Sequence, residues 1–77
     1  MEPLTATAEL DSTAISRIAY EPRRGTLSVW FRETGACYRY FHVPAAVYRA
    51  FAMASSKGRF FNLHIRDRYD FCRRQKS

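Results

Sequence analysis

The segment Thr26–Arg32 alternates strictly between apolar and mainly polar positions, and this pattern constrains the fold more than any other feature of the chain. Successive side chains of a β-strand point to opposite faces, so such alternation predicts a strand with one face in the core. The core-facing residues would be Leu27, Val29 and Phe31, and the residues of the other face would be Ser28, Trp30 and Arg32.

Two further strands are predicted beside this one, over residues 14–20 and 37–43. The links Pro22–Gly25 and Glu33–Ala36 contain turn-forming residues and are short. Short links favour antiparallel hairpins between consecutive strands, so the three strands predict a β-meander.

Pro44 ends the third strand and suits the first turn of a helix. Residues 45–54 are mostly good helix formers, and Val47, Phe51 and Ala54 would form an apolar stripe. After a break that ends at Gly58, a second helix is predicted over residues 59–66. The predicted fold class is α+β: a three-stranded antiparallel β-meander followed by two short helices packed on one sheet face.

The length of 77 residues allows one small domain, and twelve aromatic residues can supply its core. We expect a flexible N-terminal leader over residues 1–12, a single domain over residues 13–72 and a basic tail over residues 73–77. The chain has neither an apolar run long enough to span a membrane nor the pattern of a signal peptide, which indicates a cytoplasmic protein with no membrane partner.

The sequence shows none of the motifs of common catalytic or metal sites. Cys37 and Cys72 fit no zinc-ligand spacing and are expected to be free thiols, and His42 and His64 are the only histidines. We therefore predict that the protein is not an enzyme, binds no metal or cofactor, and has no small-molecule substrate.

Charge is distributed unevenly along the chain. Residues 1–38 carry four arginines against five acids, whereas residues 39–77 carry nine basic residues against two acids, for a net charge of +6 overall. A basic half on a small protein predicts attraction to polyanions such as nucleic acid.

Two groups of residues are candidates for nucleic-acid binding. The sheet face away from the helices should display Trp30, Arg32 and Arg39, together with Phe41 and, in one register, Arg17. Aromatic and arginine side chains on a sheet can stack bases and hold phosphates, but Trp30 and Phe41 could equally form a cross-strand pair or a dimer interface. The second group is on the second helix and the turn before it: Lys57, Arg59, Asn62 and Arg66. These side chains could bind phosphates or form an ordinary solvated face.

Tyr38 and Tyr40 flank Arg39, which favours water, so alternation predicts that both tyrosines face the core and have a structural role.

The pattern of apolar and aromatic residues also resembles the KTSC domain, a module named for the C-terminus of some lysyl-tRNA synthetases that also occurs as a small bacterial protein. The resemblance covers about residues 12–71 and implies a fold and, weakly, a connection to RNA. The positions that carry it are Ser12, Ile15, Ile18, Tyr20, Leu27, Val29, Phe31, Tyr38, Tyr40, Val43, Pro44, Val47, Tyr48, Ser56, Lys57, Gly58, Phe60, Phe61, Asn62 and Ile65.

These observations predict a non-enzymatic nucleic-acid-binding module, with RNA favoured by the resemblance. The alternative is a protein–protein interaction module, including a homodimer that uses the Trp30/Phe41 face.

Overall fold

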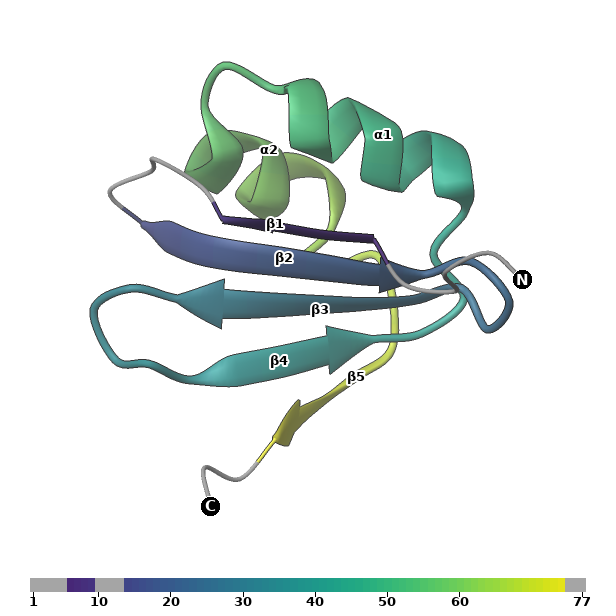
Figure 1. The fold of residues 1–77 in the computed structure, drawn as a ribbon, viewed down its shortest axis with the longest axis horizontal. Helices are drawn as coiled ribbons and strands as arrows, with labels where there is room; N and C mark the ends of the chain where they lie inside the picture. Colours follow the sequence, from purple (N-terminus) through teal and green to yellow (C-terminus); the bar gives the residue numbers. More distant parts are fainter. Residues whose placement is uncertain (1–5, 10–13, 75–77) are drawn as a thin grey trace.

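The computed structural model describes residues 6–9 and 14–74. Their elements are β1 (Ala6–Glu9), β2 (Ile15–Glu21), β3 (Thr26–Phe31), β4 (Cys37–Tyr40), α1 (Ala45–Met53), α2 (Lys57–His64) and β5 (Phe71–Arg74). The strands form one antiparallel sheet in the order β1-β2-β3-β4-β5, and α1 and α2 lie next to each other against it (Figure 1). No helix among the described residues is long and apolar enough to cross a membrane.

The predicted α+β class and both helices are confirmed, but the count of three strands is too low. β1 lies inside the segment treated above as an N-terminal leader, and β5 follows the helices and pairs with β4. All four residues of β5 are exposed, so they carry no buried–exposed alternation that a sequence pattern could reveal. The rest of the predicted leader, residues 1–5 and 10–12, lies outside the described residues, as do residue 13 of the predicted domain and residues 75–77 of the predicted tail.

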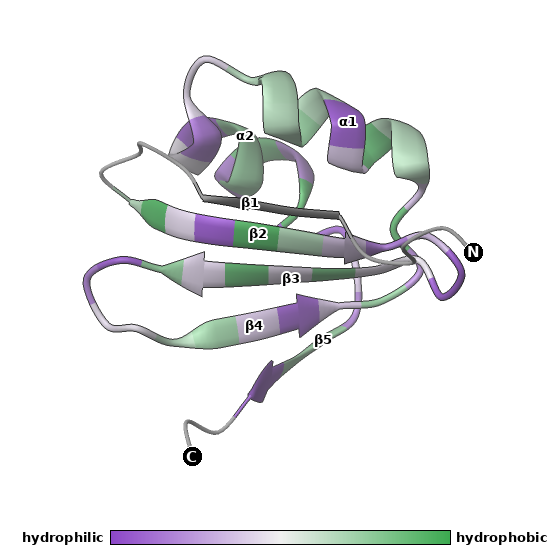
Figure 2. Ribbon diagram, viewed as in Figure 1, coloured by the Kyte–Doolittle hydropathy of each residue, from purple (hydrophilic) through white to green (hydrophobic). Residues whose placement is uncertain are grey.

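A β-bulge at Ser16 changes which side chains of β2 face the core. Ile15 pairs with Phe31 while Arg17 pairs with Trp30, so Ser16 is one extra residue in β2. Because of this insertion, Ile15 and Ile18 are both fully buried although they are three residues apart. Figure 2 shows that hydrophobic and hydrophilic residues are interspersed along β2.

The core lies between the helices and the facing side of the sheet. β2 and β3 contribute aliphatic side chains, and each helix contributes a buried phenylalanine. Complete burial of one such side chain stabilises the fold by roughly 1.5–3 kcal/mol. The core residues are Ile15, Ile18, Tyr20, Leu27, Val29, Tyr40, Val43, Phe51, Phe61 and Ile65.

Tyr20 connects the sheet to the segment that leads into α1. Its hydroxyl donates a buried hydrogen bond to the carbonyl oxygen of Val43, and its ring stacks on that of Tyr48 with 4.8 Å between centroids. The Val43 amide in turn donates to the Gly25 carbonyl at 2.8 Å. Gly25 has φ +65°, a conformation that glycine adopts without steric cost. The turn after β2 and the start of α1 are therefore fixed to each other.

We predict that Tyr20→Phe lowers the free energy of unfolding by about 1 kcal/mol, because it leaves the buried Val43 carbonyl without its donor. Tyr48→Phe is the matched control, since it keeps the same ring stack and its hydroxyl has no hydrogen bond among the described residues. Its effect should stay within about 0.5 kcal/mol. Urea unfolding of both variants measures the difference, and equal losses would contradict the role given to the Tyr20 hydroxyl.

Candidate nucleic-acid interface

The residues predicted to bind nucleic acid do not form one site, because the sheet separates them. Trp30 and Arg39 lie on the face away from the helices, whereas Asn62 and Arg66 lie on the helix side, beside Tyr38.

We call the face away from the helices the basic face. Directly paired residues of antiparallel strands point to the same side of a sheet, so the register places three arginines on this face. Arg17 pairs with Trp30, Arg39 with Cys72, and Arg74 with Cys37. The register thus places on the basic face Arg17, Ala19, Glu21, Thr26, Ser28, Trp30, Cys37, Arg39, Cys72 and Arg74.

The arginines of the basic face differ in their surroundings. The Arg17 guanidinium carbon lies 5.4 Å from the centre of the Trp30 ring, which is a cation–π contact, and Glu9 is the register partner of Arg17 in β1. Arg39 is half-buried, and its buried Nε donates to no acceptor in the described part of the chain. Burying an N–H group without an acceptor lowers the stability of the fold. The position of the Arg39 Nε is therefore not explained by packing within the described residues.

Trp30 and Phe41 do not form the cross-strand pair that was one alternative for this face. Trp30 pairs with Cys37, and Phe41 comes one residue after the end of β4, where its amide donates to the Asp70 carbonyl at 2.9 Å. Four residues along a strand separate Cys37 from Phe41, which corresponds to about 13 Å. The two aromatic rings therefore do not form a common patch across the hairpin.

The remaining predicted residues occupy other positions. Arg32 follows the end of β3, where its side chain is exposed. The Lys57 ammonium group donates to the Ala54 carbonyl oxygen, so it provides a hydrogen-bond donor for a carbonyl group at the C-terminal end of α1. Arg59 is exposed on α2, and its amide donates to the Ser56 hydroxyl at 3.3 Å as the cap of this helix.

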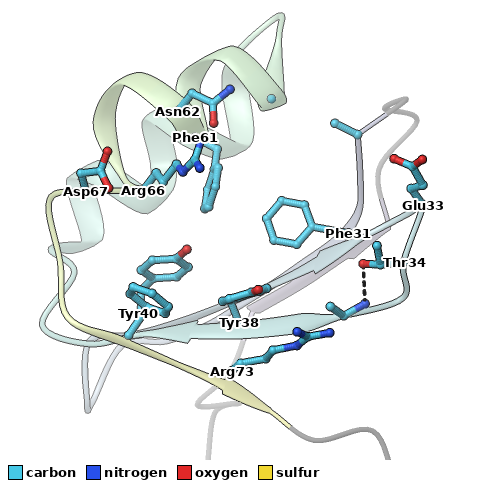
Figure 3. Close-up of a pocket in the computed structure, with 14 residues that line it drawn as sticks. Phe31, Glu33, Thr34, Tyr38, Tyr40, Phe61, Asn62, Arg66, Asp67 and Arg73 are labelled. Carbon is cyan, nitrogen blue, oxygen red and sulfur yellow. Dashed lines mark hydrogen bonds between the residues drawn. The ribbon is translucent and has the colours of Figure 1, made fainter.

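The second surface is an aromatic groove of about 700 Å³ between α2 and the β4–β5 side of the sheet (Figure 3). We use this name for the groove lined by the rings of Phe31, Tyr38, Tyr40, Phe61 and Phe71. Its polar lining comes from Glu33, Thr34, Asn62, Arg66, Asp67 and Arg73.

The aromatic rings of the groove contact one another from three strands and one helix. Phe31 meets Phe61 edge to face with 5.2 Å between centroids, and Tyr40 lies 5.3 Å from Phe71. Tyr40 is buried, as the alternation predicts, and Tyr38 is half-buried on the same side. Phe71 is 52% exposed, which makes it the most accessible of the apolar rings in the groove.

Sequence reasoning missed Phe71 and Arg73, because it placed no strand after the helices. Arg73 pairs with Tyr38, and its guanidinium carbon lies 5.8 Å from the centre of that ring. The sequence offered no clear signal here, because two apolar residues followed by two arginines do not alternate and four residues are too few to distinguish a strand from a tail.

Burial perturbs two titratable groups at these surfaces. Desolvation, reinforced by the neighbouring Tyr38 hydroxyl, raises the pKa of Tyr40 to about 12. Desolvation also raises the pKa of the Cys37 thiol, although Arg74 and Arg39 oppose this shift. Both groups are therefore neutral near pH 7. Among the described residues, no three His, Cys, Asp or Glu side chains are placed to hold a metal ion.

Comparison with known proteins assigns the family. The sequence profile of the KTSC domain matches residues 11–69. The chain belongs to the KTSC domain family. The match contains β2, β3, β4, α1 and α2, and ends before β5. The groove residues Phe71 and Arg73 thus lie beyond the part that the profile covers.

Individual relatives agree with this assignment. The crystal structure of the KTSC domain protein YPO2434 from Yersinia pestis superimposes with a TM-score of 0.86 at 32% identity, over 92% of this chain and 99% of that one. An uncharacterized protein of Stutzerimonas stutzeri is 42% identical over 69% of this chain and 73% of its own length. A lysine–tRNA ligase of Nostoc punctiforme is 34% identical over 79% of this chain, which spans 11% of that enzyme.

We predict that Tyr40 makes the stability of this KTSC domain fall between about pH 9 and about pH 11. The unfolded chain loses the tyrosine proton near pH 10 and the folded chain only near 12, so rising pH favours unfolding. The Tyr40→Phe variant keeps the aromatic ring but has no hydroxyl to titrate. Its free energy of unfolding should therefore fall by roughly 1 kcal/mol less than that of the parent protein over this pH range. Urea unfolding at both pH values checks this, and parallel losses in the two proteins would contradict it.

We also predict that the two thiols differ in reactivity. Iodoacetamide at about pH 8 should modify the exposed Cys72 of the folded protein and leave the buried Cys37 unmodified, because its raised pKa and burial both disfavour a reactive thiolate. Mass spectrometry should show one adduct in buffer and two in denaturant. In the Cys72→Ser variant the folded protein should gain none, and rapid modification of this variant would contradict the burial of Cys37.

Proposed function

We propose that this KTSC domain is a non-enzymatic module that binds single-stranded RNA, with the phosphates held by the basic face. The observation that supports this most directly is Arg39 of β4, a half-buried residue whose buried Nε has no acceptor among the residues that the structure describes. A phosphate oxygen is the acceptor that guanidinium groups bind best, since both the charge and the paired N–H groups match.

The charge around Arg39 supports the same ligand. Arg74 lies on the neighbouring strand of the same face, and Arg17 lies two strands away beside Trp30. The acid of β2 with a described side chain is Glu21, at the far end of the strand, where it lies 3.8 Å from Arg24. A sheet face with several arginines and few acids favours a polyanion as its partner over a protein surface that carries both acidic and basic groups.

Trp30 adds an aromatic ring to this face, although Arg17 already lies over it. A stacked Arg–Trp pair can accept a base on its exposed side, as arginine and aromatic planes do in single-stranded RNA recognition. RNA rather than DNA is favoured by the name of one relative, a lysine–tRNA ligase, which acts on tRNA.

The homodimer alternative is less consistent with the geometry. Two copies that met through their basic faces would place the Arg17, Arg39 and Arg74 side chains of one copy against those of the other. Like charges brought together across an interface oppose association. The separation of Trp30 from Phe41 also removes the aromatic patch on which this alternative was based.

We predict that Arg39→Gln weakens binding to a labelled single-stranded RNA by about tenfold at low salt and flattens the salt dependence by about one unit. Arg74→Gln, on the exposed edge strand, should act in the same direction without disturbing the core. The matched control is Arg23→Gln, which removes the same charge from an exposed turn residue far from Arg39. Fluorescence anisotropy at several salt concentrations gives the affinities, and Trp30 fluorescence should change on binding.

Equal weakening by Arg23→Gln would show that only total charge matters and would overturn the assignment to the basic face. Absence of binding at low salt would overturn the proposed function. In that case sedimentation of the free protein would test the homodimer.

A further inference from the structure

The aromatic groove has features that core packing does not require. Phe71 leaves half of its ring in solvent, and the Arg73 guanidinium lies over the neighbouring Tyr38 ring. Both residues come from β5, which contributes no residue to the buried core. The groove is therefore an accessible aromatic surface added to the side of a complete core.

The charges at the groove balance one another. Arg66 and Arg73 are opposed by Asp67 and Glu33, and Asn62 adds a neutral amide (Figure 3). Equal numbers of positive and negative side chains do not favour a ligand that is only a polyanion. It suits a ligand that combines a flat apolar ring, hydrogen-bond donors and acceptors at the ring edge, and a single anionic group. A nucleotide has this combination: stacking on aromatic rings, polar contacts at the base edge, and a phosphate for arginine.

The edge strand β5 joins this groove to the basic face. Arg73 pairs with Tyr38 on the groove side, while the next residue, Arg74, pairs with Cys37 on the basic face. β5 is the last strand of the sheet, so nothing in the described part of the chain separates the two surfaces at this edge. A strand bound to the basic face can therefore place one nucleotide over the edge and into the groove.

We propose that the aromatic groove binds one unstacked nucleobase, with the ring against Phe71 and Tyr38 and its phosphate towards Arg73 on the β5 side (Figure 3). The base edge then faces Asn62 and Asp67, which supply donor and acceptor groups. This inference rests on the proposed RNA binding, but the groove should also bind a free nucleotide weakly. Purines should bind more tightly than pyrimidines because their larger rings stack over more area.

The test is a titration of the full chain with guanosine, adenosine and uridine 5′-monophosphates, followed by NMR of aromatic and side-chain amide groups. We expect saturable shifts at Tyr38, Phe71 and the Asn62 amide, and none at the Trp30 indole on the opposite face. Ribose 5-phosphate has the anion and no base, so it should cause much smaller shifts. Comparable shifts with ribose 5-phosphate would overturn the base-binding proposal and leave only an anion contact.

Variants separate stacking from general surface effects. Phe71→Ala should weaken purine nucleotide binding by about tenfold, because it removes the exposed stacking ring. The matched control is Leu63→Ala, since Leu63 is also 52% exposed and does not line the groove. Arg73→Gln should weaken nucleotide binding as well, and it keeps Phe71 in case the alanine variant loses β5. Equal affinity in all three variants and the parent protein would overturn the proposal.

The two proposals can fail separately. RNA binding that changes Trp30 fluorescence, with no nucleotide shifts in the groove, would overturn the groove site and leave the basic face intact. Nucleotide binding in the groove without RNA binding at low salt would overturn the proposed function and keep the groove as a mononucleotide site. Binding of an acidic or basic peptide in place of nucleotides would overturn the assignment of the ligand.

Discussion

Burial of one sheet face under two short helices is the constraint on which the rest of the structure depends. α1 and α2 have nine and eight residues, and each contributes one fully or nearly fully buried phenylalanine, Phe51 or Phe61. Helices of this length cover the aliphatic side chains of β2 and β3, and α2 also reaches Tyr40. They do not extend over β5, so the aromatic rings between α2 and β5 line an open groove.

The same constraint explains why the opposite face is polar. Among the described residues no second layer covers this face, so it can remain in water only if its residues are small, polar or charged, or if they cover one another. Ser28 and Cys37 are small and buried there beneath longer neighbours, and Arg17 lies over Trp30. Arginine is suited to this arrangement because its aliphatic stem covers apolar surface while its charged end stays near solvent. The arginines of the basic face thus help to keep this side of the sheet in contact with water.

Edge strand β5 lies beyond residues 11–69, which match the KTSC domain, and it borders both surfaces described above. Its alternating side chains contribute Phe71 and Arg73 to the groove and Cys72 and Arg74 to the basic face. The two proposed nucleic-acid contacts depend on this alternation, because it brings a stacking ring and two arginines to the border between the surfaces. A change of register in β5 would move each of these side chains to the opposite face.

The sequence alone determined the elements whose side chains alternate or repeat with a clear period. The pattern of β3 predicted its inward residues, and Arg39 between two tyrosines predicted that Tyr38 and Tyr40 face the helices. Pro44 and the Ser55–Gly58 break located both helices to within two residues. These features are local, since each depends on neighbours along the chain that decide which side chains avoid water.

Only the tertiary structure decided which residues meet. The pairing of Trp30 with Cys37 depends on the length and conformation of the β3–β4 turn, and the bulge at Ser16 shifts β2 by one residue. Neither leaves a periodic signal in the sequence. β1 and β5 form because existing strands offer unpaired backbone groups at their edges, which four-residue segments can satisfy without a strong pattern of their own. For the same reason, the predicted nucleic-acid-binding residues lie on two surfaces that the sheet separates, and the groove residues Phe71 and Arg73 became visible only once β5 was paired with β4.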